Sequence, residues 1–268
     1  MSRAQREDKT LAKARALNNQ LYSDVRSISK RKMSHFKREL KKLCGLRGYQ
    51  PQYTEEWMGH RYRLYLTLEW LRPLITSEER ELNVLEMGGE SVVTDLLHQY
   101  FPQVRWHNTE GDMRSRWKMD DQSVDLVVCS EVLEHLSDLP EGIQDAFRKT
   151  GLRLVLKEIY RVLKTGGFLF VTTPNVASVL QLRSILAGYT PWHFELHVRE
   201  YTTHDLWAEL TNAGFTIERY RTVHCLSIDK KIDYTPIFKM LLDYHFITTD
   251  RGDDIFLIAR RVDGEGGL

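Results

Sequence analysis

The sequence predicts an α/β fold with a doubly wound, mostly parallel sheet and an N-terminal helical extension, and three observations lead to this prediction. Short apolar runs alternate with segments of helical periodicity from residue 83 onward. The runs at 124–129 and 168–172 are almost continuously apolar, which is typical of strands buried on both faces of a parallel sheet. The 268 residues, of which 42% are apolar, suffice for one large core plus an extension.

The first predicted strand, residues 84–87, leads into the turn Gly88-Gly89-Glu90-Ser91 and then into a helix that begins near Val92. Glycines allow a ligand to approach the backbone closely, and a helix N-terminus presents unpaired N–H groups. The turn therefore suits a nucleotide-like or amino-acid-like group. Turns of this kind are also common in α/β proteins that bind nothing there.

Acidic side chains follow two of the later strands. Residues 104–108 alternate as a half-buried strand, and Glu110 comes just after it, where a carboxylate can accept hydrogen bonds from two ribose hydroxyls. The central strand at 124–130 is followed at once by Glu131, Glu134 and His135. Because open parallel sheets bind ligands at the carboxyl ends of their strands, we expect these groups to border a site.

The remaining elements follow from periodicity, caps and breakers. Helices are expected at 54–71, capped by Thr54, at 152–163, at 176–187, and from Thr203 to residue 213, and strands at 168–172, 215–223 and 253–260.

The N-terminal 48 residues are expected to form a separate basic unit, because they contain fourteen Lys and Arg against four Asp and Glu. Apolar residues recur at helical spacing in two stretches, 17–28 and 33–43. These amphipathic helices could pack on the domain or on a second copy of it, lie on an anionic membrane surface, or contact nucleic acid. We divide the chain into an arm at 1–48, a domain at 49–262 and a flexible tail at 263–268.

Bulk properties exclude several classes of protein. There is no run of 18 apolar residues, and the N-terminus is too charged for a signal peptide. The three cysteines, Cys44, Cys129 and Cys225, are far apart and have no metal-like spacing. A reducing, cytoplasmic location is therefore expected.

The stretch 192–201, WHFELHVREY, is unusually dense in polar and aromatic groups. If it were a strand, His193, Glu195 and His197 would project to one side, as metal ligands could. The stretch matches no HExxH pattern and has no partner cysteine, so we predict no metal. Trp192 and Tyr201 are candidates for an apolar substrate wall, with core packing as the alternative.

Taken in order, VLEMGGES, SVDLVVCSEVLEHL, LKTGGFLFVTTPN, HVREYT and NAGF resemble the class I S-adenosylmethionine-dependent methyltransferases over about residues 54–260. Within that superfamily the chain is most similar to the small-molecule branch that includes ubiquinone-biosynthesis O-methyltransferases. The resemblance implies a Rossmann-like sheet of six or seven strands with the last pair antiparallel. It also implies S-adenosyl-L-methionine as cofactor and methyl transfer to a small-molecule acceptor, such as a hydroxyl of a sugar, quinone or secondary metabolite.

The resemblance also assigns site residues. Those expected to meet the methionine part of the cofactor are Glu86, Gly88, Gly89 and Glu90. Those expected near the ribose or adenine are Glu110 or Asp112, and those near the sulfonium are Cys129, Ser130 and Glu131. Asn175 is expected to border the substrate.

Two features depart from the family pattern. The family's turn usually has a glycine at alternate positions, and here Glu90 and Val92 occupy the later ones. The Glu90 side chain could pair with the positively charged cofactor or obstruct the site. Only 24 residues separate Tyr100 from Asp125, whereas a strand, a helix and a further strand need about 30. We therefore expect six strands rather than seven.

A methyl group on a sulfonium is already activated, so the protein must mainly align the reactants and accept a proton from an oxygen nucleophile. His193 and His197 are the first candidates for the base and His135 is the next, with structural imidazoles as the alternative. Two other functions remain open: a nucleic-acid methyltransferase that uses the basic arm, and a methyltransferase-like scaffold without activity.

Overall fold

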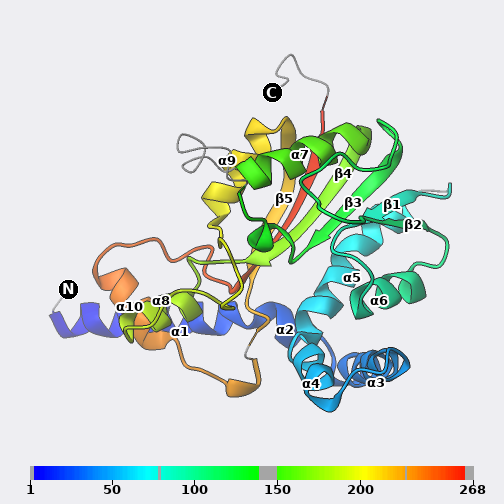
Figure 1. The fold of residues 1–268 in the computed structure, drawn as a ribbon. Coiled ribbons are helices and arrows are strands. Elements are labelled where there is room, and N and C mark those ends of the chain that lie inside the picture. Colours follow the sequence, from blue (N-terminus) through cyan, green and yellow to red (C-terminus); the bar gives the residue numbers. More distant parts are fainter. Residues whose placement is uncertain (1–2, 78–79, 139–149, 227, 263–268) are drawn as a thin grey trace.

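The computed structural model describes residues 3–77, 80–138, 150–226 and 228–262. At its centre lies a six-stranded sheet with the strand order β2-β1-β3-β4-β6-β5 (Figure 1). The strands are β1 Asn83–Glu86, β2 Arg105–Asn108, β3 Val124–Ser130, β4 Leu163–Pro174, β5 Phe215–Val223 and β6 Asp254–Arg261.

The strand directions confirm the predicted fold class. Neighbouring strands β2, β1, β3 and β4 are parallel, whereas β6 runs antiparallel to both β4 and β5. Residues 109–123, which connect β2 to β3, form turns and bends without a helix. The short spacing between Tyr100 and Asp125 therefore marks the crossover unit that lacks its helix.

Helices cover both faces of the sheet, because successive residues of the buried strands point in opposite directions. Leu126 and Val128 of β3 belong to a core shared with α3 Lys30–Leu46, α5 Arg61–Thr76 and α6 Val92–Tyr100. Val127 and Cys129 belong to the core on the other face, with α7 Thr150–Val162 and α9 Thr203–Asn212 (Figure 1). This double cover explains why β3 reads as a continuous apolar run.

The N-terminal helices pack on the domain through their apolar faces. Helix α3 places Met33, Phe36 and Leu40 in the same core as the sheet. Helix α1 Arg3–Leu21, which is joined to α3 by α2 Ser23–Ser27, packs against α10 Thr235–Asp243. The division at residue 48 and a self-association through these helices stay predictions. Helix α10 lies between β5 and β6, where the sequence predicted no helix or strand.

Several expected elements differ in detail. The single helix expected at 54–71 is two helices, α4 Pro51–Gly59 and α5, with a break at His60, and Pro51 rather than Thr54 starts the first. Thr202, not Thr203, caps α9 through a reciprocal capping box with Asp205. Helix α8 Val179–Leu186 starts later than expected, after its cap Ser178.

The strand considered as a possibility for the stretch 192–201 does not form, since residues 189–200 form turns, bends and irregular chain. The tail at 263–268 lies outside the described residues. Of the helices in the described ranges, none is long and apolar enough to cross a bilayer.

Candidate functional site

The glycine turn after β1 presents bare backbone to open space. Gly88 and Gly89 have φ values of 116° and 75°, which side-chain-bearing residues rarely adopt. A Cβ added to Gly89 would meet nothing within 4 Å. Ser91 then caps α6, with its Oγ accepting from the Val93 amide at 3.1 Å. Glu90 is exposed, so its side chain is not packed into the fold.

Glu86, the last residue of β1, is a buried carboxyl beneath this turn. The Asn108 side-chain amide donates to Glu86 Oε2 at 2.7 Å. Burial outweighs that hydrogen bond and raises the pKa of Glu86 from 4.5 to about 7. A positively charged group placed above the turn would therefore find a carboxyl that is easily ionised near neutral pH.

Because folding raises the pKa of Glu86, this residue favours the folded state most at low pH. Below about pH 4.5 the carboxyl is protonated in both states, and its contribution falls by about 3 kcal/mol as the pH rises through 7. We expect Glu86→Gln to remove this loss. Chemical denaturation at pH 4.5 and pH 8 measures it, and equal stability differences between the two proteins at both pH values would contradict the assignment.

The two acidic candidates after β2 differ in the hydrogen bonds that their carboxylates accept. Asp112 accepts from Arg114 Nε at 2.9 Å, from Arg114 Nη2 at 2.8 Å and from the Arg114 amide at 2.9 Å. These hydrogen bonds lower the pKa of Asp112 to about 2. Glu110 is exposed, and its carboxylate makes no hydrogen bond or ion pair within the described part of the chain. Glu110 is therefore the carboxylate that is available to a ligand.

The carboxyl end of β3 carries two acidic groups. Glu131 has a φ of 56°, an uncommon conformation for a residue other than glycine, and it pairs with Arg63 Nη1 of α5 at 2.5 Å. Glu134 is fully buried and accepts a hydrogen bond from Thr173 Oγ1 at 2.9 Å. Burial, followed by the charge of Glu131, raises the pKa of Glu134 well above its usual value.

A cavity of about 600 Å³ lies over these strand ends. Its walls come from α4, α5, the turn after β3, α8 and the segment 192–197. Five lining residues have buried side-chain atoms without hydrogen-bond partners in the described structure: His60, Arg63, Glu131, Glu134 and His193. Because buried polar atoms are normally paired, these atoms are candidates for contacts with a polar ligand.

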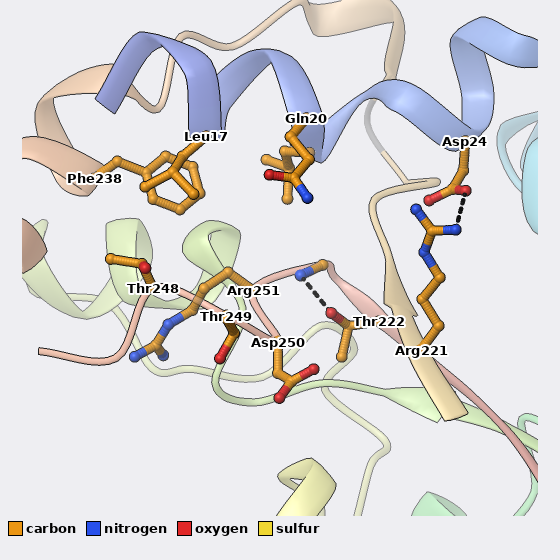
Figure 2. Close-up of a pocket in the computed structure, with 12 residues that line it drawn as sticks. Leu17, Gln20, Asp24, Arg221, Thr222, Phe238, Thr248, Thr249, Asp250 and Arg251 are labelled. Atoms are coloured by element: carbon orange, nitrogen blue, oxygen red, sulfur yellow. Dashed lines mark hydrogen bonds and ion pairs between the residues drawn. The ribbon is translucent and has the colours of Figure 1, made fainter. Parts of the chain in front are cut away.

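A second cavity, of about 210 Å³, lies between α1 and the chain that precedes β6 (Figure 2). Asp24 and Arg221 form an ion pair of 3.0 Å at its wall. None of the site residues expected from the sequence lines this cavity. The cavity at the strand ends is therefore the candidate active site.

All three predicted histidines lie in the wall of the active-site cavity, and two of them share one carboxylate. Glu200 Oε2 lies 2.8 Å from His193 Nδ1, and Glu200 Oε1 lies 2.7 Å from His197 Nδ1. Burial opposes the charge of Glu200, but the hydrogen bonds from His193 and His197 lower its pKa. Sequence reasoning missed Glu200, because its spacing of seven and three residues from the histidines matches neither a strand nor a known motif.

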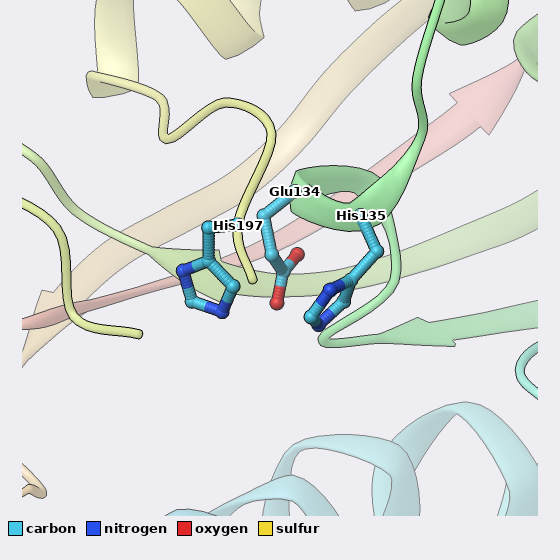
Figure 3. A group of neighbouring side chains, drawn as sticks. All are labelled: Glu134, His135 and His197. Carbon is cyan, nitrogen blue, oxygen red and sulfur yellow. The ribbon is translucent and has the colours of Figure 1, made fainter. Parts of the chain in front are cut away.

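His135, the third candidate base, meets His197 edge to face with 4.8 Å between the ring centroids. Burial and the neighbouring His197 lower the pKa of His135. Figure 3 shows Glu134, His135 and His197 together, and their potential ligand atoms all lie within 4.8 Å of one another. This is the grouping among the described residues that comes nearest to a cation site. The grouping of His193, Glu195 and His197 considered for the strand does not form, since Glu195 is exposed and the segment is irregular.

Of the other predicted residues, some line the cavity and others lie in the core or bind neighbouring loops. Trp192 lines the cavity, whereas Cys129 lies in the core below it. Ser130 Oγ is 2.8 Å from Thr172 Oγ1. Asn175 is buried, and its amide donates to the carbonyls of Asp250 and Gly252 at 3.0 and 2.7 Å. The buried Tyr201 hydroxyl donates to the Leu133 carbonyl at 3.3 Å, so Asn175 and Tyr201 hold loops in place and do not line the cavity.

Comparison with known proteins identifies a family and a relative that this chain resembles. The methyltransferase domain family matches residues 58–220. A probable S-adenosylmethionine-dependent methyltransferase of Mycolicibacterium smegmatis is 33% identical over 100 residues, which are 37% of this chain and 32% of that protein. The match thus spans about a third of that relative.

A solved structure shares this fold. An S-adenosylmethionine-dependent methyltransferase from Archaeoglobus fulgidus aligns with a TM-score of 0.51 and 14% identity, over 77% of this chain and 99% of that chain. A Haloferax volcanii putative methyltransferase in complex with the Trm112 activator aligns with a TM-score of 0.49 and 14% identity, over 77% and 91% of the two chains. With the family match over more than half of its length, the chain belongs to the class I S-adenosylmethionine-dependent methyltransferases.

Proposed function

We propose that this protein transfers the methyl group of S-adenosylmethionine to a hydroxyl group of a small-molecule acceptor bound in the 600 Å³ cavity. The observation that supports this most is the pair of imidazoles in the cavity wall, His193 and His197, with His193 Nε2 buried and unpartnered among the described residues. Such a nitrogen can accept the proton that an attacking hydroxyl must lose.

In the proposed reaction, the acceptor oxygen attacks the methyl carbon and a C–O bond forms while the C–S bond breaks. The electron pair of that bond stays on sulfur, so the second product is S-adenosylhomocysteine. The hydroxyl proton moves to an imidazole nitrogen of His193 or His197. The residues around the cavity hold the acceptor in line and exclude water.

For the cofactor we propose the turn after β1 and its surroundings. The open space above Gly89 can accept the methionine part, and the buried Glu86 lies beneath the turn. The exposed Glu90 carboxylate can attract the positively charged cofactor without filling the turn. Glu131 at the end of β3 would lie on the sulfonium side, and Glu110 would accept from the ribose hydroxyls.

We expect Glu110→Ala to weaken binding of S-adenosylhomocysteine by about 1–3 kcal/mol, or about 5- to 150-fold in Kd, because two hydroxyls lose their acceptor. Asp112→Ala is the matched control, since Arg114 already occupies its carboxylate. Isothermal titration calorimetry compares the two variants with the parent protein. A larger loss for Asp112→Ala than for Glu110→Ala would contradict the assignment.

The function itself is tested in two steps. Calorimetry with S-adenosylhomocysteine should give measurable binding, and its absence at millimolar ligand would favour the scaffold without activity. Incubation with methyl-labelled S-adenosylmethionine and a panel of sugars, phenols and quinols should then label a hydroxyl. Transfer only to nitrogen or carbon acceptors would contradict the proposal.

Nucleic acid is the second candidate acceptor, and the surface of α3 supports it. Arg31, Lys32, Arg38, Lys41 and Lys42 are all exposed on this helix, while its apolar side is buried in the core. A face of this kind can contact phosphates but has no free apolar stripe to insert into a bilayer. The labelling panel should therefore include RNA at low and high salt, and salt-sensitive labelling of RNA would favour this alternative.

A further inference from the structure

Glu200 has the environment of a residue that orients others. Its side chain is completely buried, and it accepts three hydrogen bonds: from the His193 amide at 2.6 Å, from His193 Nδ1 at 2.8 Å and from His197 Nδ1 at 2.7 Å. A buried carboxylate with three donors has little freedom to move. It also lies behind the imidazoles, since His193 and His197 line the cavity whereas Glu200 does not.

The chain around Glu200 is fixed to the strand ends. The Val198 and Arg199 amides both donate to the Glu134 carbonyl, at 2.8 and 3.2 Å. Tyr201 forms a parallel bridge with Asn175, and its carbonyl accepts from the Val176 amide at 3.1 Å. The position of the Glu200 carboxylate is thus set by backbone contacts to the turns after β3 and β4, even though residues 192–200 form no helix or strand.

We propose that Glu200 is a positioning residue that holds His193 and His197 in the same tautomer, with Nδ1 protonated and Nε2 free to act on the acceptor. An ionised carboxylate accepts hydrogen bonds but donates none, so each Nδ1 that contacts it must carry the proton. In a neutral imidazole the other nitrogen, Nε2, is then the acceptor. His193 Nε2 is buried without a partner in the described structure, so no hydrogen bond at this nitrogen favours the other tautomer.

This inference rests on the proposed function, and it adds a division of roles. The imidazoles touch the acceptor, and one of them takes the hydroxyl proton at Nε2 as the C–O bond forms. Glu200 touches neither the acceptor nor the cofactor, and it stabilises the imidazolium that results, as the buried carboxylate does in a carboxylate–histidine pair of a hydrolase. One carboxylate serves two imidazoles, so the pair is suited to accepting a single proton.

The tautomers are measured first, on the full chain without any acceptor. Nitrogen-15 NMR of histidine-labelled protein distinguishes Nδ1–H from Nε2–H imidazoles, and His193→Gln and His197→Gln assign the two signals. We expect the Nδ1–H form at both residues. The Nε2–H form at either residue would overturn the proposal, whether or not an acceptor is known and whether or not a Glu200 variant folds.

The kinetic test compares three variants on the acceptor found in the labelling panel. Glu200→Gln should lower kcat by about 100-fold or more, with a smaller change in KM and an unchanged Kd for S-adenosylhomocysteine. Glu200→Asp, which keeps the charge, should recover part of the loss. Glu195→Gln is the matched control, an exposed glutamate in the same segment, and should behave as the parent protein.

A kcat for Glu200→Gln within about threefold of the parent value would overturn the role of Glu200. The role of Glu200 and the proposed function can fail independently of each other. If S-adenosylhomocysteine binds and the tautomers are as expected but no hydroxyl is ever labelled, the proposed acceptor class is wrong while the orientation of the histidines by Glu200 stands.

Discussion

Replacing His193 with glutamine is expected to lower kcat for methyl transfer by about 10²- to 10⁴-fold, the range that a positioned general base contributes. The imidazole is buried in the cavity wall, and its Nε2, which has no hydrogen-bond partner in the described part of the chain, can receive a proton. Glutamine has a comparable size but no basic nitrogen. Because His193 lies on the acceptor side, the Kd for S-adenosylhomocysteine should not change.

Steady-state kinetics with the labelled acceptor measure this effect. His204→Gln is the matched control, since His204 is an exposed histidine in the first turn of α9. The double variant His193→Gln with His197→Gln tells whether the second imidazole substitutes for the first. Full activity in the double variant would show that neither histidine is the base.

Replacing Phe36 with alanine is expected to lower the free energy of unfolding of the whole domain by about 3–5 kcal/mol. Phe36 is 1% exposed and meets Tyr65 of α5 and Tyr100 of α6 edge to face, with ring centroids 5.4 and 6.3 Å apart. Removing the ring leaves a cavity between the N-terminal helix α3 and the core of the sheet. The basic arm should therefore unfold together with the domain.

Urea denaturation monitored by tryptophan fluorescence and by circular dichroism measures the change. The neighbouring His35→Ala is the control, since His35 is exposed and its ion pair with Glu39 is on the surface, so we expect a change within about 0.5 kcal/mol. An early, separate transition for the first 48 residues in either variant would mean that the arm is an independent unit.

Much of the fold could be predicted from local patterns. The apolar run of β3, the glycine turn after β1 and the cap Ser91 each depend on residues that are adjacent in sequence. The spacing between Tyr100 and Asp125 predicted that one unit is shortened or absent, because a crossover has a minimum length, and the structure shows that the helix is the missing part. Helix α10 was missed, since its burial comes from contact with α1 more than 200 residues away.

The candidate site was predicted in its residue types but not in its partners. His193 and His197 were singled out as candidate bases, and a strand with Glu195 on the same side was considered only as one possibility for this segment. The chain instead follows the hydrogen bonds of Val198 and Arg199 to the Glu134 carbonyl, and Glu200 becomes the carboxylate behind both imidazoles. Glu110 and Asp112 could not be separated either, because the difference lies in the hydrogen bonds from Arg114.

The sequence by itself determined the class of fold, the strand ends at which we expect a ligand, and the set of acidic and imidazole groups near them, because apolar periodicity and turn residues act locally. Only the tertiary structure decided which of these groups are free and which are paired. Asn175 and Tyr201 are occupied in holding loops, whereas Glu110 and His193 keep atoms without hydrogen-bond partners among the described residues. Hydrogen-bond partners are set by side chains that come together from distant parts of the chain, and no spacing along the sequence encodes them.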